Sequence, residues 1–434
     1  MKKSVLLILS AALMLSACDN KPEITTADIE IALQNNGEPF AQDGINVIIK
    51  ETASGTTFNA LTDENGIAKF TLSSGIYEGS ATWKTSAEGI QTIYNGINSN
   101  IVVSAGKNET FPLELKTSQA SQIIIKELYT TGCQGVDPKK PFSNDAYVIL
   151  YNNSDQEADA SDVCFAFCNP FNSYQTNKYL TDGKLFFEEL GWLPSGYSAW
   201  WFQKEVKIAP YSQIIVAIKG AIDNTVTYPE SVDLSHADYY MYDPESGFNN
   251  ASAYPAPLES MPADHYLKTF VISKGNAWPI SNSSPAFYIF KNANIEAFSK
   301  DENNYDRTEN AKLPVLKIPM SSVIDAVEVF DFTNKEKNAK RFPSSIDAGY
   351  VEIISKNGHT IYRNVDKEAT EALAENEGKL VYDYAGGTLD IEGTTDPSGI
   401  DAEASIAKGA HIIYKDTNNS SNDFHQRNKA SIKK

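Results

Sequence analysis

The segment TDENGIAKFTLSSG, residues 62–75, constrains the fold of this chain more than any other. The Asp-Glu-Asn-Gly sequence is typical of a tight turn, because Asn and Gly accept positive φ angles. Ala68, Phe70 and Leu72 then alternate with polar residues, so their side chains project from one face of a strand. The pattern predicts a β-hairpin and indicates an antiparallel all-β fold.

Short strands of this kind recur over residues 27–116 and predict a small β-sandwich. The pattern T-D-x-N-G-x-A-x-F-x-L with a following G-x-Y resembles carboxypeptidase-regulatory-like or prealbumin-like domains. The resemblance implies a spacer or scaffold rather than a catalytic unit. Residues 117–121, TSQAS, are typical of a linker.

A second series of apolar strands begins after this linker and extends over residues 122–426. The segments IIIKEL, YVILYN, APYSQIIVA, TIYRN and DTNNSSNDF, in this order, resemble a lamin-tail domain, which has an immunoglobulin-like fold. The resemblance implies a second antiparallel β-sandwich that closes at residues 416–424 and leaves only 425–434 frayed. The region is longer than such domains usually are, and we expect insertions at about 169–205, 223–284 and 365–408.

The N-terminus has the features of a bacterial lipoprotein signal. A basic start, MKK, precedes a short apolar run, and LSAC resembles a lipobox. This predicts a signal peptide at residues 1–17, lipidation of Cys18 and a tether over 18–26. An ordinary secretory signal with a chance cysteine is the alternative. The whole layout resembles an uncharacterised family of Bacteroidetes lipoproteins, which implies an envelope protein anchored by lipid, at the outer membrane, with its periplasmic or surface side left open.

Three cysteines remain after Cys18, and an odd number leaves at least one outside any intramolecular disulfide. Cys164 and Cys168 flank the strand-like sequence FAF, which would separate them too widely for a bond. Cys133 could pair with Cys164 or Cys168. Buried free thiols are the alternative.

The charge balance bears on the partners. The net charge is −19, and the acidic residues are dispersed along the chain. Such a surface repels phosphate backbones, so no nucleic acid partner is expected.

No established catalytic motif occurs in the sequence. G-x-S-x-G, H-E-x-x-H and a phosphate-binding loop are all absent. The five histidines show no ligand spacing beyond common dipeptide patterns, so we expect neither catalysis nor a cofactor.

The insertions are rich in aromatic residues, which can stack on sugars or anchor a protein partner. The candidate ligand-binding residues are Trp192, Trp200, Trp201, Tyr239, Tyr240 and Tyr242. The competing interpretation is that these rings form a local core. We expect a binding or accessory protein that recognises a glycan, a peptide or an outer-membrane receptor; a structural envelope or adhesion protein and a hydrolase are the alternatives.

Overall fold

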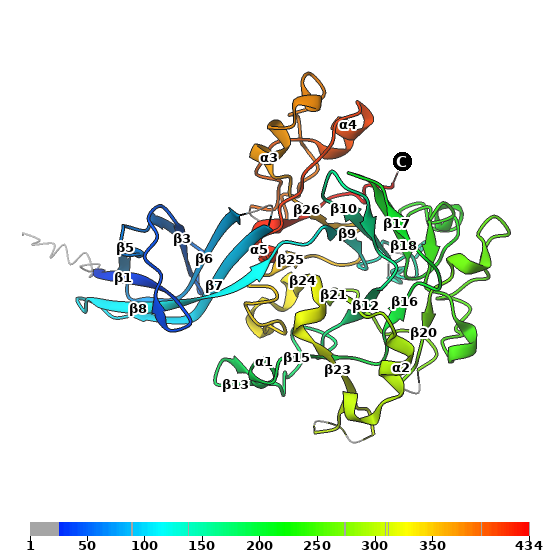
Figure 1. Cartoon of the computed structure of the whole chain (residues 1–434), viewed down its shortest axis with the longest axis horizontal. Coiled ribbons are helices and arrows are strands. Elements are labelled where there is room, and N and C mark those ends of the chain that lie inside the picture. Colours follow the sequence, from blue (N-terminus) through cyan, green and yellow to red (C-terminus); the bar gives the residue numbers. More distant parts are fainter. Residues whose placement is uncertain are drawn as a thin grey trace, which may run out of the picture.

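The computed structural model describes residues 26–87, 90–137, 139–272, 275–308, 310, 312–391 and 393–433, without the side chains of 86–91, 118 and 119. The predicted signal peptide, the predicted lipidation site Cys18 and nearly all of the predicted tether lie outside the described residues. The chain forms a small N-terminal domain and a larger β-domain that carries a short helical lobe (Figure 1). None of the described helices has the length and apolar character needed to cross a bilayer.

The N-terminal domain is a sandwich with one hydrophobic core. Its strands are β1 (Thr26–Asn35), β2 (Glu38–Pro39), β3 (Asn46–Glu51), β4 (Thr57–Leu61), β5 (Ile67–Ser73), β6 (Gly75–Ala87), β7 (Ile90–Val103) and β8 (Glu109–Gln119). One side pairs β5, β1 and the first half of β8, and the other pairs β4, β3, β6, β7 and the end of β8. Because β8 belongs to both sides, the sheets are joined along one edge.

The predicted alternation in β5 is confirmed, whereas the predicted hairpin is wrong. Ala68, Phe70 and Leu72 are buried, and the intervening residues are exposed. The Asp-Glu-Asn-Gly turn is also present, and Gly66 has a φ of +74°. However, β4 pairs with β3 and β5 pairs with β1, so the turn carries the chain from one sheet to the other.

The larger domain contains two six-stranded sheets. Sheet I has the order β19 (Tyr239–Tyr240), β18 (Gln213–Ala217), β10 (Tyr147–Asn152), β9 (Ile123–Tyr129), β26 (Thr360–Arg363), β27 (Phe424–Arg427). Sheet II has the order β20 (Lys268–Thr269), β16 (Trp200–Trp201), β12 (Val163–Phe167), β21 (Ala286–Lys291), β24 (Val323–Asp331), β25 (Val351–Ile353). The all-β sandwich prediction is confirmed. Among the described strands, the pairs β1–β8, β18–β19 and β24–β25 are parallel, and each is joined by the long connection that parallel pairing requires.

Sheet II is buried on both faces. Phe165 and Phe167 of β12 pack into the core that also contains side chains of sheet I. Cys164, Ala166 and Cys168 point to the opposite face and into a second core. The elements outside sheet II that contribute to this second core include α1 (Phe186–Glu189), β15 (Trp192–Ser195) and β23 (Val315–Pro319).

The helical lobe covers the outer face of sheet I and corresponds to the predicted insertion at 365–408 (Figure 1). Its helices are α3 (Lys367–Glu371) and α4 (Ala402–Ala407). Lys126 of β9 is fully buried beneath the lobe, with its Nζ 2.7 Å from a carboxylate oxygen of Glu403. The rings of Tyr151, Tyr362 and Tyr414 surround this ammonium group at 5.6–5.9 Å. The ion pair and the aromatic cage together fix the lobe on the sheet.

A buried arginine connects sheet I to sheet II. Arg363 of β26 forms an ion pair with Asp325 of β24, and its Nη1 lies 3.7 Å from Asp416 and 3.9 Å from Asp423. Its guanidinium also donates to the backbone carbonyls of Ile125 and Lys415. These contacts hold the segment 416–424 in place, as a closing turn of the sandwich would require.

The prediction that residues 425–434 are frayed is wrong for the described part of this segment. His425 and Gln426 are buried within β27, and Ala430 is buried in the main core. His425 Nδ1 lies 2.7 Å from the side-chain oxygen of Asn364. Burial lowers the pKa of His425 to about 3, so this imidazole is neutral.

The two domains meet at the same closing turn. Asn95 of β7 is fully buried, and its side chain donates to the carbonyl oxygens of Thr417 and Asn418. Thr82 Oγ1 accepts a hydrogen bond of 3.1 Å from Asn422. The side-chain contacts supplement the covalent linker and orient the N-terminal domain.

Candidate ligand-binding site

Three of the six aromatic residues predicted to bind a ligand lie in the core. Trp200 and Tyr240 are fully buried, and only 8% of Tyr239 is exposed. The indole of Trp200 packs 5.9 Å from the ring of Phe248 and 6.2 Å from that of Tyr254. The prediction is therefore wrong for these three, because their rings pack into the main core, where a ligand cannot reach them.

Two further candidates are half-buried and contact other aromatic rings. Trp192 lies 5.9 Å from Phe187 of α1. Tyr242 stacks on Tyr240 at 5.3 Å. Neither residue lines the cleft described next.

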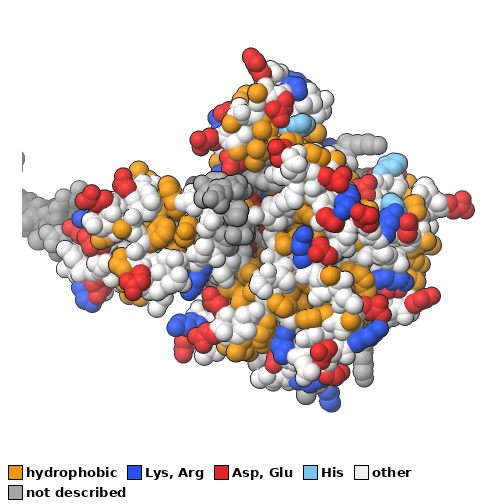
Figure 2. Space-filling model, viewed as in Figure 1, with side chains coloured by type: hydrophobic (Ala, Val, Ile, Leu, Met, Phe, Trp, Pro, Cys, Tyr) orange, Lys and Arg blue, Asp and Glu red, His pale blue; other side chains and the backbone are white. Residues whose placement is uncertain are grey.

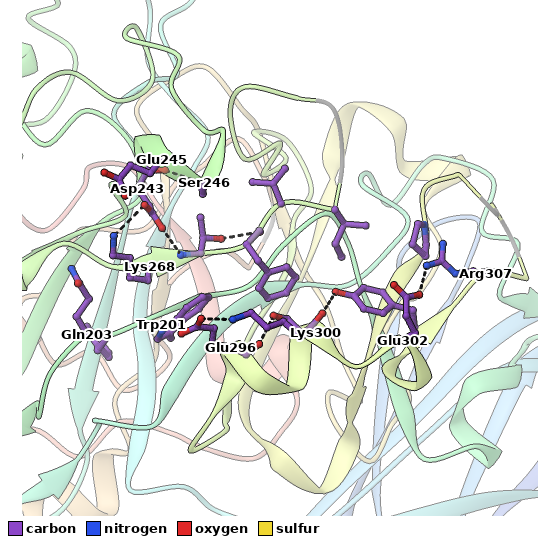
Figure 3. Close-up of a pocket in the computed structure, with 18 of the residues that line it drawn as sticks. Trp201, Gln203, Asp243, Glu245, Ser246, Lys268, Glu296, Lys300, Glu302 and Arg307 are labelled. Atoms are coloured by element: carbon purple, nitrogen blue, oxygen red, sulfur yellow. Dashed lines mark hydrogen bonds and ion pairs between the residues drawn. The ribbon is translucent and has the colours of Figure 1, made fainter.

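Trp201 is half-buried and lies in the wall of an open cleft of about 980 Å³. The cleft is formed by three parts of the chain: residues around 201–203, the segments 243–246 and 268–272, and the residues 296–307 and 312–314. The first two belong to the insertions predicted at 169–205 and 223–284. Figure 3 shows Asp243, Glu245 and Lys268 at one end of the cleft and Glu302 and Arg307 at the other.

Strand alternation decides which of the two adjacent tryptophans reaches the cleft. Strand β16 pairs with β12 on one side and with β20 on the other. Because successive side chains on a strand point to opposite faces, Trp200 enters the core and Trp201 turns to the cleft. The indole of Trp201 lies 6.2 Å from the ring of Phe270 at an angle of 31°. The two rings make an aromatic surface within a cleft that is otherwise lined by charged, polar and some apolar side chains.

The cleft contains three ion pairs. Asp243 accepts from Lys268 Nζ at 3.3 Å and from the backbone N–H of Thr269 at 3.1 Å. The other two pairs are Glu296–Lys300 and Glu302–Arg307, each at 2.6 Å.

Neighbouring groups shift the pKa values of two residues in the cleft. The hydrogen bond from Lys300 lowers the pKa of the Glu296 carboxyl. Burial and the negative charge of Glu302 raise the pKa of Tyr305, whose hydroxyl donates to the carbonyl of Ser299 at 2.6 Å. Near neutral pH the cleft therefore presents an ionised Glu296 and a neutral phenol at Tyr305.

The third part of the cleft, residues 296–307 and 312–314, lies outside the insertions that the sequence predicted. It begins within helix α2 (Ile295–Lys300), which is capped by the side chain of Asn294. The Glu296–Lys300 spacing of four residues is a signal of a short exposed helix. Nothing in this local pattern distinguishes a ligand-contacting helix from an ordinary surface connection.

The predicted disulfide between Cys133 and Cys164 or Cys168 is absent, and the alternative of free thiols is observed. All three cysteines are free and buried. The thiol of Cys168 donates to the carbonyl of Arg341 at 3.4 Å, and burial raises the pKa of Cys133 to about 12. Within the described residues, no group of three or more His, Cys, Asp or Glu side chains could hold a metal ion.

The fold is that of an all-β protein with two sandwiches. Residues 209–398 match the model of a family described as "Protein of unknown function (DUF4876)". The chain also resembles the crystal structure of a DUF4876 family protein from Bacteroides thetaiotaomicron VPI-5482, with a TM-score of 0.51 and 20% sequence identity. This match covers 92% of this chain and 94% of that chain, and it supports the all-β fold.

Two further solved structures match less closely. A DUF3823 family protein from Parabacteroides merdae ATCC 43184 has a TM-score of 0.16 and 11% identity over 34% of this chain and 69% of its own. A streptococcal ancillary pilin has the same TM-score and identity over 44% of this chain and 58% of its own. No curated protein matches the sequence.

Proposed function

We propose that this protein is a non-catalytic glycan-binding protein of the cell envelope, with its ligand site in the cleft around Trp201. The observation that carries the proposal is the aromatic surface of Trp201 and Phe270 inside a cleft lined by charged side chains. Aromatic rings pack against the apolar faces of sugars, and carboxylate and ammonium groups bind their hydroxyls. A cleft of this volume suits a small oligosaccharide.

Trp201→Ala should weaken glycan binding at least about tenfold, because the substitution removes a large anchoring surface at the centre of the cleft. The measurement is a screen of the mature protein against a glycan array, followed by calorimetric titration of the best ligand. Tyr382→Ala is a matched control, since Tyr382 is an exposed aromatic residue that does not line the cleft. We expect it to leave the affinity unchanged within about twofold.

Other outcomes would support the alternatives. Equal glycan affinities of folded Trp201→Ala and wild type would show that the cleft is not the binding site. A folded wild type that binds no glycan would contradict the proposal and favour a structural role, a peptide or a receptor partner. Release of reducing sugar from a bound glycan would indicate a hydrolase.

The proposal places the protein on a membrane through lipid at Cys18. Two or three acyl chains give stable anchoring where one chain would be marginal. Cys18→Ser should therefore move the protein from the membrane pellet to the soluble fraction of a host that processes lipoproteins. Lys2→Ser is a control that keeps the cysteine. Membrane retention of Cys18→Ser would contradict lipid anchoring.

A further inference from the structure

We infer that the cleft selects uncharged oligosaccharides over both anionic and cationic ones. This inference rests on the proposed glycan-binding function and adds the chemical class of the ligand. It is carried by the charge balance of the cleft, by the state of its ion pairs and by their arrangement along the cleft.

The lining of the cleft is electrically balanced, whereas the protein as a whole is acidic. Three acid–base pairs line the cleft, together with one further acid, Glu245, and one further base, Lys312. Four acidic groups therefore face four basic groups, and the formal charge of the lining is zero. The complete chain has a net charge of −19. The neutral cleft is thus a local exception on an acidic molecule.

The acidic and basic groups of the three pairs already have partners. Of the described charged groups that line the cleft, only Glu245 and Lys312 stand outside these pairs. At the three pairs, a charged group on a ligand would have to displace one member of a pair or lie there without a counter-ion. A sugar hydroxyl needs neither, because it can donate to a free carboxylate oxygen and accept from a remaining N–H. The contact to Lys300 involves one carboxylate oxygen of Glu296, and the contact to Arg307 involves one oxygen of Glu302. The second oxygen of each carboxylate makes no hydrogen bond within the described residues.

The ion pairs follow one another along the cleft. Figure 3 shows the Asp243–Lys268 pair at one end, the Glu296–Lys300 pair beside Trp201, and the Glu302–Arg307 pair at the other end. Such a row offers repeated hydroxyl-binding groups on either side of the stacking surface. It therefore fits a linear chain of several sugar units better than a single monosaccharide.

The net negative charge of the rest of the molecule also affects which glycans bind. Without the cleft residues, 52 acidic and 33 basic residues remain of the 56 and 37 in the chain. Their field repels uronates and sulfated sugars. A cationic glycan would be attracted over the whole surface, but that attraction falls steeply with salt and needs no aromatic cleft.

The test is affinity electrophoresis of the full mature protein against matched panels of polysaccharides. The neutral panel contains glucans, mannan, xylan and galactan, and the charged panel contains polygalacturonate, chondroitin sulfate and chitosan. We expect the tightest ligand to be neutral and dependent on Trp201. Its affinity should change by less than about twofold between 50 and 500 mM NaCl, whereas a ligand held by ion pairs would weaken severalfold.

A charge-reversal variant tests the local argument. Glu245→Lys makes the lining positive and should increase the affinity for polygalacturonate at least about fivefold. Glu377→Lys makes the same change of charge in the helical lobe, where Glu377 is exposed, and should give no comparable increase. Equal gains in both variants would show that overall charge, and not the cleft, sets the preference.

The remaining outcomes separate this inference from the proposed function. Tighter, Trp201-dependent binding of a charged polysaccharide by the wild type would overturn the selection for neutral ligands and leave glycan binding intact. The absence of binding to every polysaccharide would overturn both.

Discussion

Arg363→Met should lower the free energy of unfolding by about 3–5 kcal/mol, because it leaves buried carboxylates without their counter-charge. Arg363 is fully buried and forms an ion pair with Asp325. Asp416 and Asp423 lie within 4 Å of the same guanidinium and are also buried. Urea unfolding followed by tryptophan fluorescence measures the change.

The pH dependence gives this prediction a second test. Burial raises the pKa of Asp325, and Arg363 opposes that shift by favouring the ionised carboxylate. Without the arginine, the folded protein would hold a proton that the unfolded chain releases at neutral pH. Stability then falls as pH rises, so the loss should be larger at pH 8 than at pH 5.

A control removes an exposed ion pair of the same type. Arg307 and Glu302 lie 2.6 Å apart with 47% and 78% of their side chains exposed. Arg307→Met should cost no more than about 1 kcal/mol. A similar small cost for Arg363→Met would mean that the buried carboxylates become neutral or hydrated without penalty.

The pairing of strands was less predictable than their existence. The turns at residues 63–66 and 356–358 have the residues that tight turns require, and both have a glycine with positive φ. The sequence suggested a hairpin at residues 63–66, but each of the two turns leads from one sheet to another. Turn chemistry is local, whereas the partner of a strand depends on which core its apolar face enters.

The closing turn and the residues after it show that a polar segment near a terminus can be folded and buried. Residues 416–424 were expected to be folded on the basis of the DTNNSSNDF resemblance, and the buried Asp416 and Asp423 agree with that expectation. The next residues, 425–434, were expected to be frayed. His425 is nevertheless buried, since Tyr384 and Asn364 supply hydrogen bonds from the rest of the domain. Such partners are distant in the chain and leave no local signal.

The candidate site was predicted only in part for a similar reason. Adjacent residues such as Trp200 and Trp201 point to opposite faces of a strand, but their sequence does not tell which face is the core. Both faces of sheet II are covered in its centre, and the cleft lies at the edge near β20. The position of β16 within the sheet, which is set by long-range pairing, therefore decides the role of each tryptophan.

Trp200→Ala should destabilise the protein by about 3–5 kcal/mol, because it leaves a large cavity in the main core. Trp200 is fully buried, and its indole N–H has no hydrogen-bond partner within the described residues. The cost is therefore one of packing, and Trp200→Phe, which retains much of the volume, should cost distinctly less. Urea unfolding of the two variants beside Trp201→Ala measures the contrast, since Trp201 is half-buried at the cleft. If Trp201→Ala were the more destabilising variant, the indole at the cleft would be the structural one, and the stacking surface assigned to ligands would belong to the core.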